Sequence, residues 1–220
     1  MQQPTITKRA DDSGTLGVVV NQLTQKVSQL EADINVLQTS SSTQNTDIQL
    51  AKSSTFIRWG NSHCSNGSEL VYEGVIGGSN YNTPGSAANH LCLTMSPVFA
   101  SMHNEAQLYG TEYESAGSAH DKDAVCSVCR SSYSSTIMVP GTNVCNPGWH
   151  LQYSGYLMAG HYGHAGPTEF ICVDTAMESS PHTNQDDNGR LLYFTGAVCG
   201  SLPCDPYING KTILCAVCSK

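Results

Sequence analysis

The first 54 residues carry an apolar repeat with a period of seven. After Leu16, apolar side chains recur at alternating spacings of four and three residues, which keeps one seam facing partner helices in a coiled coil. The seam alternates β-branched residues at a with leucines at d: Val20, Leu23, Val27, Leu30, Ile34 and Leu37. Polar residues fill the seam at 41–47 and Ile48 resumes it. We predict a disordered tail at 1–13 and an interrupted parallel coiled-coil stalk at 14–54.

An amphipathic helix packed on the rest of the protein is the alternative to a coil. Two features favour the coil. The apolar seam takes only two positions in seven, and Lys26 at g lies five residues before Glu31 at e, the offset of interhelical ion pairs. β-branched a residues with leucine at d favour two strands on the general rule.

The pattern changes after residue 54 to short β-branched and aromatic runs separated by Gly, Pro, Asn and Ser. These runs predict strands, since such residues suit a pleated surface. They lie at 55–59, 70–72, 136–139, 151–153, 191–194 and 212–214. No helical period is present here. The expected fold class is mainly β, with long loops, behind the helical stalk.

Residues 55–220 also repeat themselves. At an offset of 81, Cys64 aligns with Cys145 and Tyr72 with Tyr153, together with several glycines, and both halves close on a Cys-x-Val-Cys motif. We predict a tandem-duplicated domain with halves at 55–134 and 135–220. Neither half is expected to bury its core alone.

Composition narrows the partners and the compartment. Ten cysteines in repeating spacings indicate a disulfide framework and therefore an oxidising compartment. We expect a secreted, extracellular protein whose signal peptide has been removed or left out of this sequence. A net charge of −8 with only ten Lys and Arg argues against nucleic acid as a partner. No run of about 18 apolar residues is present, so no membrane span is expected.

Several motifs carry a resemblance to a known family. These are Cys145-Asn146-Pro147-Gly148-Trp149, Tyr153-Ser154-Gly155-Tyr156, Gly77-Gly78-Ser79-Asn80-Tyr81 and the two closing Cys-x-Val-Cys pairs. Together they resemble the C-terminal non-collagenous domain of type IV collagen, and more closely that of the short-chain, spongin-like collagens of invertebrates. The stalk departs from this family because it has no Gly-X-Y run. The resemblance implies a non-enzymatic, matrix-forming protein that assembles as a trimer.

The resemblance also implies a nested disulfide pattern. Written for this chain, the pairs are Cys64 with Cys129, Cys92 with Cys126, Cys145 with Cys218, Cys172 with Cys215, and Cys199 with Cys204 in a small extra loop. Spacing alone does not choose among pairings. The alternatives for the two Cys-x-x-Cys motifs are a shared zinc ion or redox-active dithiols.

Three further candidate sites depend on local motifs. The loop His161-Tyr162-Gly163-His164 aligns with Asn80-Tyr81-Asn82-Thr83 and offers aromatic and imidazole groups to a sugar or a metal, or only to contacts within the protein. His120, Asp121 and Asp123 form a candidate cation site, since alternate carboxylates suit Ca²⁺. Asn66 begins a glycosylation sequon. No nucleophile elbow or zinc-protease motif appears, and we expect neither an enzyme nor a cofactor.

The sequence thus predicts a secreted, oligomeric extracellular-matrix protein of structural or interaction type. We expect the protein to associate with copies of itself, with a trimer favoured. Other matrix proteins or glycans are further candidate partners. The alternative is a lectin-like protein that binds glycans multivalently, with the coil multiplying weak sites.

Overall fold

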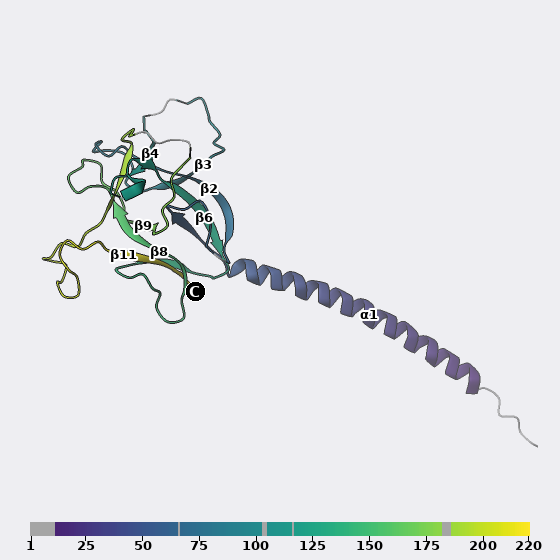
Figure 1. Ribbon diagram of the computed structural model, residues 1–220. Helices are drawn as coiled ribbons and strands as arrows, with labels where there is room; N and C mark the ends of the chain where they lie inside the picture. Colours follow the sequence, from purple (N-terminus) through teal and green to yellow (C-terminus); the bar gives the residue numbers. More distant parts are fainter. Residues whose placement is uncertain (1–11, 66, 103–104, 116, 182–185) are drawn as a thin grey trace, which may run out of the picture. The chain divides into compact units, whose positions relative to one another are not determined.

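The computed structural model describes residues 12–65, 67–102, 105–115, 117–181 and 186–220. The chain divides after Ala51 into two compact units (Figure 1). We call the first the stalk and the second, residues 52–220, the head.

The stalk is one helix, α1 (Asp12–Ala51), of 40 residues. It continues through the polar heptad at 41–47, where threonine hydroxyl groups bond to carbonyl groups of the preceding turn. Thr43 donates to the carbonyl of Thr39 at 3.0 Å, and Thr46 donates to that of Ser42 at 3.0 Å. The polar heptad is therefore helical. One continuous coil requires a helix here, whereas a coil joined to the head by a flexible linker does not. Residues 12 and 13 of the predicted tail are helical, and the remainder of that tail lies outside the described residues.

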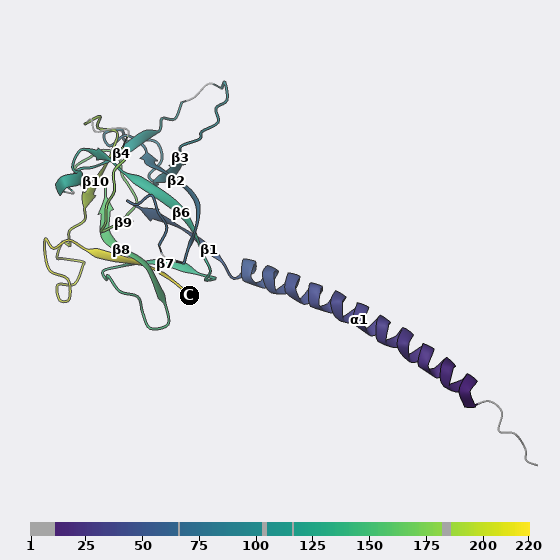
Figure 2. The same cartoon turned by 45° about the vertical axis from the view of Figure 1, so that its right-hand side comes forward.

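The head is mainly β, as predicted. Its strands are β1 (Ser54–Trp59), β2 (Glu69–Gly78), β3 (Leu91–Thr94), β4 (Tyr109–Tyr113), β5 (Lys122–Asp123), β6 (Val125–Ser131), β7 (Thr136–Pro140), β8 (His150–Ala159), β9 (Ile171–Asp174), β10 (Arg190–Phe194) and β11 (Leu214–Ser219). One short 3₁₀ helix, η1 (Gly117–Ala119), precedes β5. Long loops connect these strands and project from the head (Figures 1 and 2).

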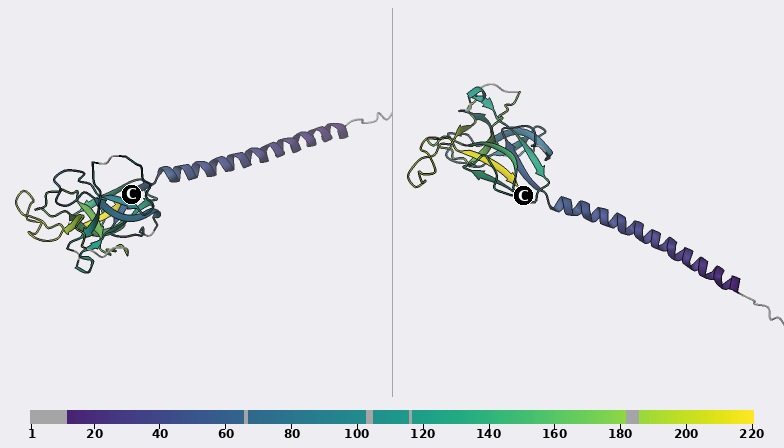
Figure 3. Two further views of the ribbon diagram at one scale, coloured as in Figure 1. Left: turned by 90° about the horizontal axis from the view of Figure 1, so that it is seen from above. Right: turned by 60° about the horizontal axis from the view of Figure 1, so that its bottom comes forward.

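The strands form a single sheet that closes on itself. Its path runs β10-β4-β2-β6-β1-β9-β8, and a further pairing of β8 with β10 returns to the start. The strands accordingly wrap around a common interior (Figure 3). Strand β11 adds to β8, and β7 adds to β11. Among the described strands, β3 pairs only with β2 and β7 only with β11, so each keeps one open edge.

Strand pairing is similar in the two halves, with β7 and β8 offset by 81 residues from β1 and β2, and β11 offset by 89 from β6. Phe56 on β1 lies opposite Cys129 on β6, and Ile137 on β7 lies opposite Cys218 on β11. The β2–β6 and β8–β11 pairs each contain one register shift at corresponding positions. The β2–β3 and β8–β9 pairs correspond as well. The repeat in sequence is thus matched by a repeat in register.

Two glycines allow a close approach at equivalent places. A Cβ atom at Gly74 on β2 would lie 1.8 Å from the carbonyl oxygen of Leu93, and one at Gly155 on β8 would lie 2.2 Å from that of Val173. Any larger residue would push β3 or β9 away from its neighbour. Both positions therefore need glycine for the same geometric reason.

The interior is shared between the halves. One cluster of buried residues combines Trp59, Ile76, Cys92, Tyr113, Ala119, Ala124 and Cys126 with Met158, Ile171, Val173 and Leu192. A second combines Phe56 and Cys129 with Tyr153, Leu157, Cys172, Cys215 and Val217. Since both clusters draw on both halves, neither half has a hydrophobic core of its own, and the head folds as one unit.

Candidate functional site

All ten cysteines form disulfides within the chain. The bonds are Cys64–Cys129, Cys92–Cys126, Cys145–Cys218, Cys172–Cys215 and Cys199–Cys204. These are the pairs that the resemblance implied. Because every sulfur is in a disulfide, the two Cys-x-x-Cys motifs present no thiol for zinc or dithiol chemistry. The Cys199–Cys204 bond closes a loop that has no counterpart in the first half.

The segment after β9 belongs to the second half but packs on the first. We call residues 175–181 the second arm. The amide of Glu178 donates to the carbonyl of Gly60 at 2.8 Å, and the amide of Ser180 donates to that of Asp123 at 2.9 Å. The carboxylate of Glu178 also accepts bonds from the amide and the hydroxyl of Ser62, at 3.0 and 2.6 Å. The second arm therefore links the halves through its backbone.

The equivalent segment of the first half follows β3, and we call residues 95–102 the first arm. It lies in the loop that projects between β3 and β4 (Figure 2). Its apolar side chains face solvent: Val98 is 96% exposed, Phe99 86% and Met102 79%. An exposed apolar group of this kind is typical of a contact surface.

A groove of about 350 Å³ lies where the second half would hold such an arm. It is lined by Gly141 and Thr212, among others. Gly141 is the register equivalent of Gly60, since its amide donates to the carbonyl of Leu214 just as that of Gly60 donates to Val125. The groove beside Gly141 and Thr212 thus lies at the positions that correspond to Gly60 and Asp123, and the second arm bonds to the latter pair.

The predicted stalk seam is exposed along α1. The members expose between 49% and 67% of their surface: Val20, Leu23, Val27, Leu30, Ile34, Leu37 and Ile48. An exposed apolar seam of this length is unfavourable for a single helix in water, and a partner helix would cover it.

The predicted ligand loop gathers an aromatic cluster. The ring of His164 lies 4.7 Å from that of Tyr81 and 5.1 Å from that of His161. Tyr193 on β10, which the sequence analysis did not single out, lies 5.2 Å from His161 and 5.7 Å from His164. Tyr162 stacks on His161 at 4.3 Å and is 97% exposed. Four of the five predicted residues therefore come together.

The fifth, Asn80, has another role. Its side-chain oxygen accepts a bond from the amide of Asn82 at 2.9 Å, and its nitrogen donates to the carbonyl of Asn188 at 3.4 Å. It holds the turn that carries Tyr81. The cluster borders a groove of about 740 Å³, which continues over Phe170, Phe194 and Val198. Burial, followed by the nearby His161, lowers the pKa of His164, so this ring is neutral at pH 7. The groove offers aromatic faces and neutral imidazole to a ligand.

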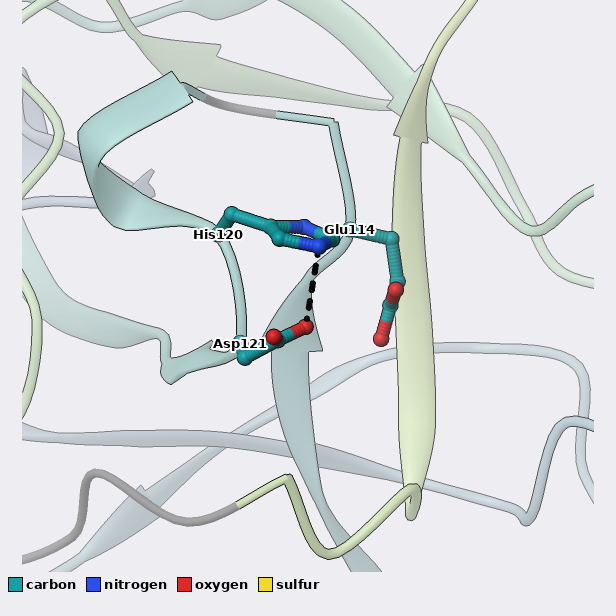
Figure 4. A group of neighbouring side chains, drawn as sticks. All are labelled: Glu114, His120 and Asp121. Carbon is teal, nitrogen blue, oxygen red and sulfur yellow. Dashed lines mark ion pairs between the residues drawn. The ribbon is translucent and has the colours of Figure 1, made fainter.

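The predicted cation site is assembled from different residues than expected. His120 follows η1, Asp121 precedes β5, and Glu114 follows β4 (Figure 4). One ligand atom from each lies within 4.8 Å of the others, and the Nε2 atom of His120 lies 3.3 Å from a carboxylate oxygen of Asp121. Asp123 is not part of this group. On the short strand β5 it pairs with Glu112 instead.

Burial raises the pKa of the Glu112, Glu114 and Asp123 carboxyl groups. Neighbouring carboxylates add to the effect, those of Asp121 and Asp186 on Glu114 and that of Asp187 on Asp123. Burial and neighbouring carboxylates thus both oppose ionisation of the acidic groups in this part of the head.

A buried guanidinium lies where loops of the two halves meet. Arg190 is fully buried and donates to the carbonyl oxygens of Ser79, Ala88 and Pro167 at 3.0, 2.7 and 3.2 Å. Burial, and then the charge of Arg190, lowers the pKa of His90 to about 4. His90 is accordingly neutral at pH 7, and its 3.7 Å approach to Glu169 is not an ion pair there.

The sequon residue Asn66 lies outside the described residues. Within the described part of the chain, no helix has both the length and the apolar character needed to cross a bilayer. No known protein family matches the chain when its sequence is compared with family models.

Proposed function

We propose that this chain is a secreted structural or interaction protein of the extracellular matrix, and that its function is to assemble with copies of itself. The observation that carries the proposal is the incomplete head. The second arm bonds to the first half, while no described residue of the same chain covers the apolar side chains of the first arm or occupies the groove of the second half. A second copy supplies both missing pieces.

The proposal treats the halves as two copies of one unit. Matching registers, matching bulges and matching glycines at an offset of 81 support this duplication. Within one chain, the second arm bonds to the first half. The rotation that relates the two halves, applied again, would place the first half of the next chain in the groove of the second half. Repeated head-to-tail contacts of this kind generate rings when the rotation closes.

The duplication assigns specific contacts between copies. The amide of Val98 takes the part of Glu178 and donates to the carbonyl of Gly141 in the neighbouring copy. The amide of Ala100 takes the part of Ser180 and donates to that of Thr212. The open edges of β7 and β3 then pair as β1 and β9 do within the chain, where Trp59 lies opposite Val173. Open edges are favourable templates for such pairing.

The stalk supplies the second element of the assembly. A parallel coil covers the exposed seam and places the heads at the same end. Three chains agree with the family that the head resembles, whereas the general rule for the seam residues favours two. Five disulfides and the absence of a membrane-spanning helix among the described residues are consistent with an extracellular protein.

Light scattering of the intact, oxidised protein tests the proposal. We expect a discrete mass of three chains, and a variant with Leu23→Ser and Leu30→Ser should still associate through its heads at high concentration. A monomeric wild-type protein at all concentrations would contradict the proposal. A dimer would retain self-assembly and reject the trimer.

A lectin is the second candidate, and the aromatic groove favours it. Tyr162, Tyr193 and the imidazoles of His161 and His164 line a groove large enough for a sugar residue, and aromatic faces stack on sugars. A glycan array with the wild type, the stalk variant and Tyr193→Ala distinguishes the candidates. Binding that needs both Tyr193 and the oligomer supports the lectin, since avidity multiplies weak sites. Absence of glycan binding leaves the structural function.

A further inference from the structure

The carboxylate cluster at the end of β4 has oxygen atoms without partners. Glu112 is 98% buried, because only 2% of its surface is exposed. Its Oε1 atom accepts a bond from the amide of Asp187 at 3.1 Å, while its Oε2 atom has no hydrogen-bond partner among the described residues. The Oε1 atom of Glu114, two residues further along the same face, is also buried without a partner among them.

Unpaired buried carboxylate oxygens are costly, and native proteins resolve them with a hydrogen bond, a proton or a cation. Two of the three side chains that meet here, Glu114 and Asp121, are acidic, and one ligand atom from each lies within 4.8 Å of the others and of His120. A bound cation would neutralise this charge and give the buried Oε1 atom of Glu114 a partner.

The backbone fixes the three candidate ligands. The amide of Glu114 donates to the carbonyl of Leu192 at 2.9 Å, that of Asp121 to Tyr113 at 2.9 Å, and that of His120 to Gly117 at 3.1 Å. Asp121 has a φ of 56°, a left-handed conformation that few residue types tolerate. This turn brings the carboxylate of Asp121 beside the ring of its neighbour His120. The ligand atoms are therefore held close together before any ion binds.

We infer that Glu114, His120 and Asp121 bind a divalent cation of the kind that accepts imidazole, with Zn²⁺ as the representative ion. The donors are the Nε2 atom of His120 and one carboxylate oxygen from each acidic residue. Imidazole and carboxylate together suit Zn²⁺, and water completes a four-coordinate site. Ca²⁺ takes six to eight oxygen ligands, which this trio does not provide.

This inference does not depend on the proposed self-assembly. The ion would link the end of β4 to the turn before β5, both in the first half. Its function would be to stabilise that turn, where the described residues 186–188 of the second half also approach.

Calorimetric titration of the full-length, oxidised protein tests the site, after dialysis against a chelator. ZnCl₂ and CaCl₂ are titrated separately. We expect one Zn²⁺ per chain and no saturable Ca²⁺ binding at comparable concentrations. His120→Gln and Asp121→Asn should each weaken Zn²⁺ binding by about tenfold or more. Asparagine tolerates the left-handed conformation at 121, so Asp121→Asn removes charge without straining the turn.

Two controls make the result specific. Glu73→Gln removes an exposed carboxylate on β2 and should leave Zn²⁺ binding unchanged. His164→Gln removes an imidazole of the aromatic groove, the rival zinc site, and should also have no effect. Zn²⁺ binding that survives His120→Gln and disappears in His164→Gln would overturn the inference, as would no Zn²⁺ binding by the wild type. Circular dichroism of each variant excludes misfolding as the cause.

Discussion

The amide of Glu178 donates a 2.8 Å hydrogen bond to the carbonyl oxygen of Gly60, across 118 positions of sequence and between the two halves of the head. By register, Val98 and Gly141 are the counterparts of these two residues. Val98 is 96% exposed, and Gly141 borders a groove. The first contact is made within the chain, and the proposed self-assembly would make the second contact between two copies.

Replacing Val98 by proline should weaken association of the heads, because proline has no amide hydrogen to donate to Gly141 of the neighbouring copy. Loss of about 1 kcal/mol per contact corresponds to an association about fivefold weaker. Sedimentation velocity over a concentration series measures this, on the Leu23→Ser and Leu30→Ser background so that the stalk does not mask the effect.

Val98→Ala is the matched control, since it removes most of the side chain and keeps the amide. Equal weakening by alanine and proline would show that the apolar side chain, and not the backbone bond, makes the contact. No change in either variant would mean that the first arm is not an interface.

Replacing Leu23 and Leu30 by serine should lower both the mass of the assembly and the helical signal at low concentration. An isolated helix of this composition gains its stability from a covered seam, and these two residues occupy d positions in it. Val18→Ser with Val36→Ser is the control, because these side chains are just as apolar and exposed but lie outside the seam. If both pairs act alike, general hydrophobicity rather than a heptad seam drives association.

The disulfides should differ in their contribution to stability. Chain-entropy arguments give about 4 kcal/mol for Cys64–Cys129, whose residues are 65 apart, and about 2 kcal/mol for Cys199–Cys204, whose residues are 5 apart. Denaturant unfolding of the two double-serine variants compares them. A larger loss for the short loop would show that native-state contacts outweigh loop length.

His90 should make the head less stable in mild acid. Its pKa is about 4 in the folded protein against an ordinary value of 6.5, so the unfolded chain takes up the proton first as the pH falls. The contribution is complete above pH 6.5 and is lost progressively down to about pH 4, to a total of about 3 kcal/mol. Unfolding free energies of the wild type and His90→Gln, measured from pH 7.5 to 4, should therefore converge towards acid pH.

Arg190, Glu169 and Trp59 are the neighbours of His90, and they remain unchanged in the His90→Gln variant. His150→Gln, on the surface, is the control for losing an imidazole in general. If the unfolding free energies of the wild type and His90→Gln differ by a constant amount from pH 7.5 to 4, His90 does not cause the loss of stability in acid.

Local patterns predicted the β class and six of the strands, with errors where pairing extends a strand. The run at 70–72 lies inside β2 (Glu69–Gly78), which continues through glycines that β propensity disfavours. The run at 212–214 reaches β11 only at its last residue. β3, β4, β5, β6 and β9 lie outside the predicted runs. In β6 (Val125–Ser131), cysteine, serine and arginine interrupt the β-branched residues, and pairing with β1 and β2 specifies the strand.

The sites depended even more on long-range contacts. The sequence predicted that His120 and Asp121 belong together, since they are adjacent, but it paired them with Asp123 on spacing alone. Glu114 joins them because β4 and the turn before β5 are antiparallel neighbours, which no local motif records. Tyr193 enters the aromatic cluster through the pairing of β10 with β8. Such residues are found from topology, not from a local pattern.

The loop closed by Cys199–Cys204 occurs once in each chain, whereas the proposed duplication would give other surfaces of the head two related versions. This loop therefore distinguishes the second half of the head from the first. A molecule that recognises this loop binds in a one-to-one ratio with chains, and one that recognises a surface common to both halves binds at twice that ratio. Stoichiometry alone would then tell which kind of surface a newly found partner uses.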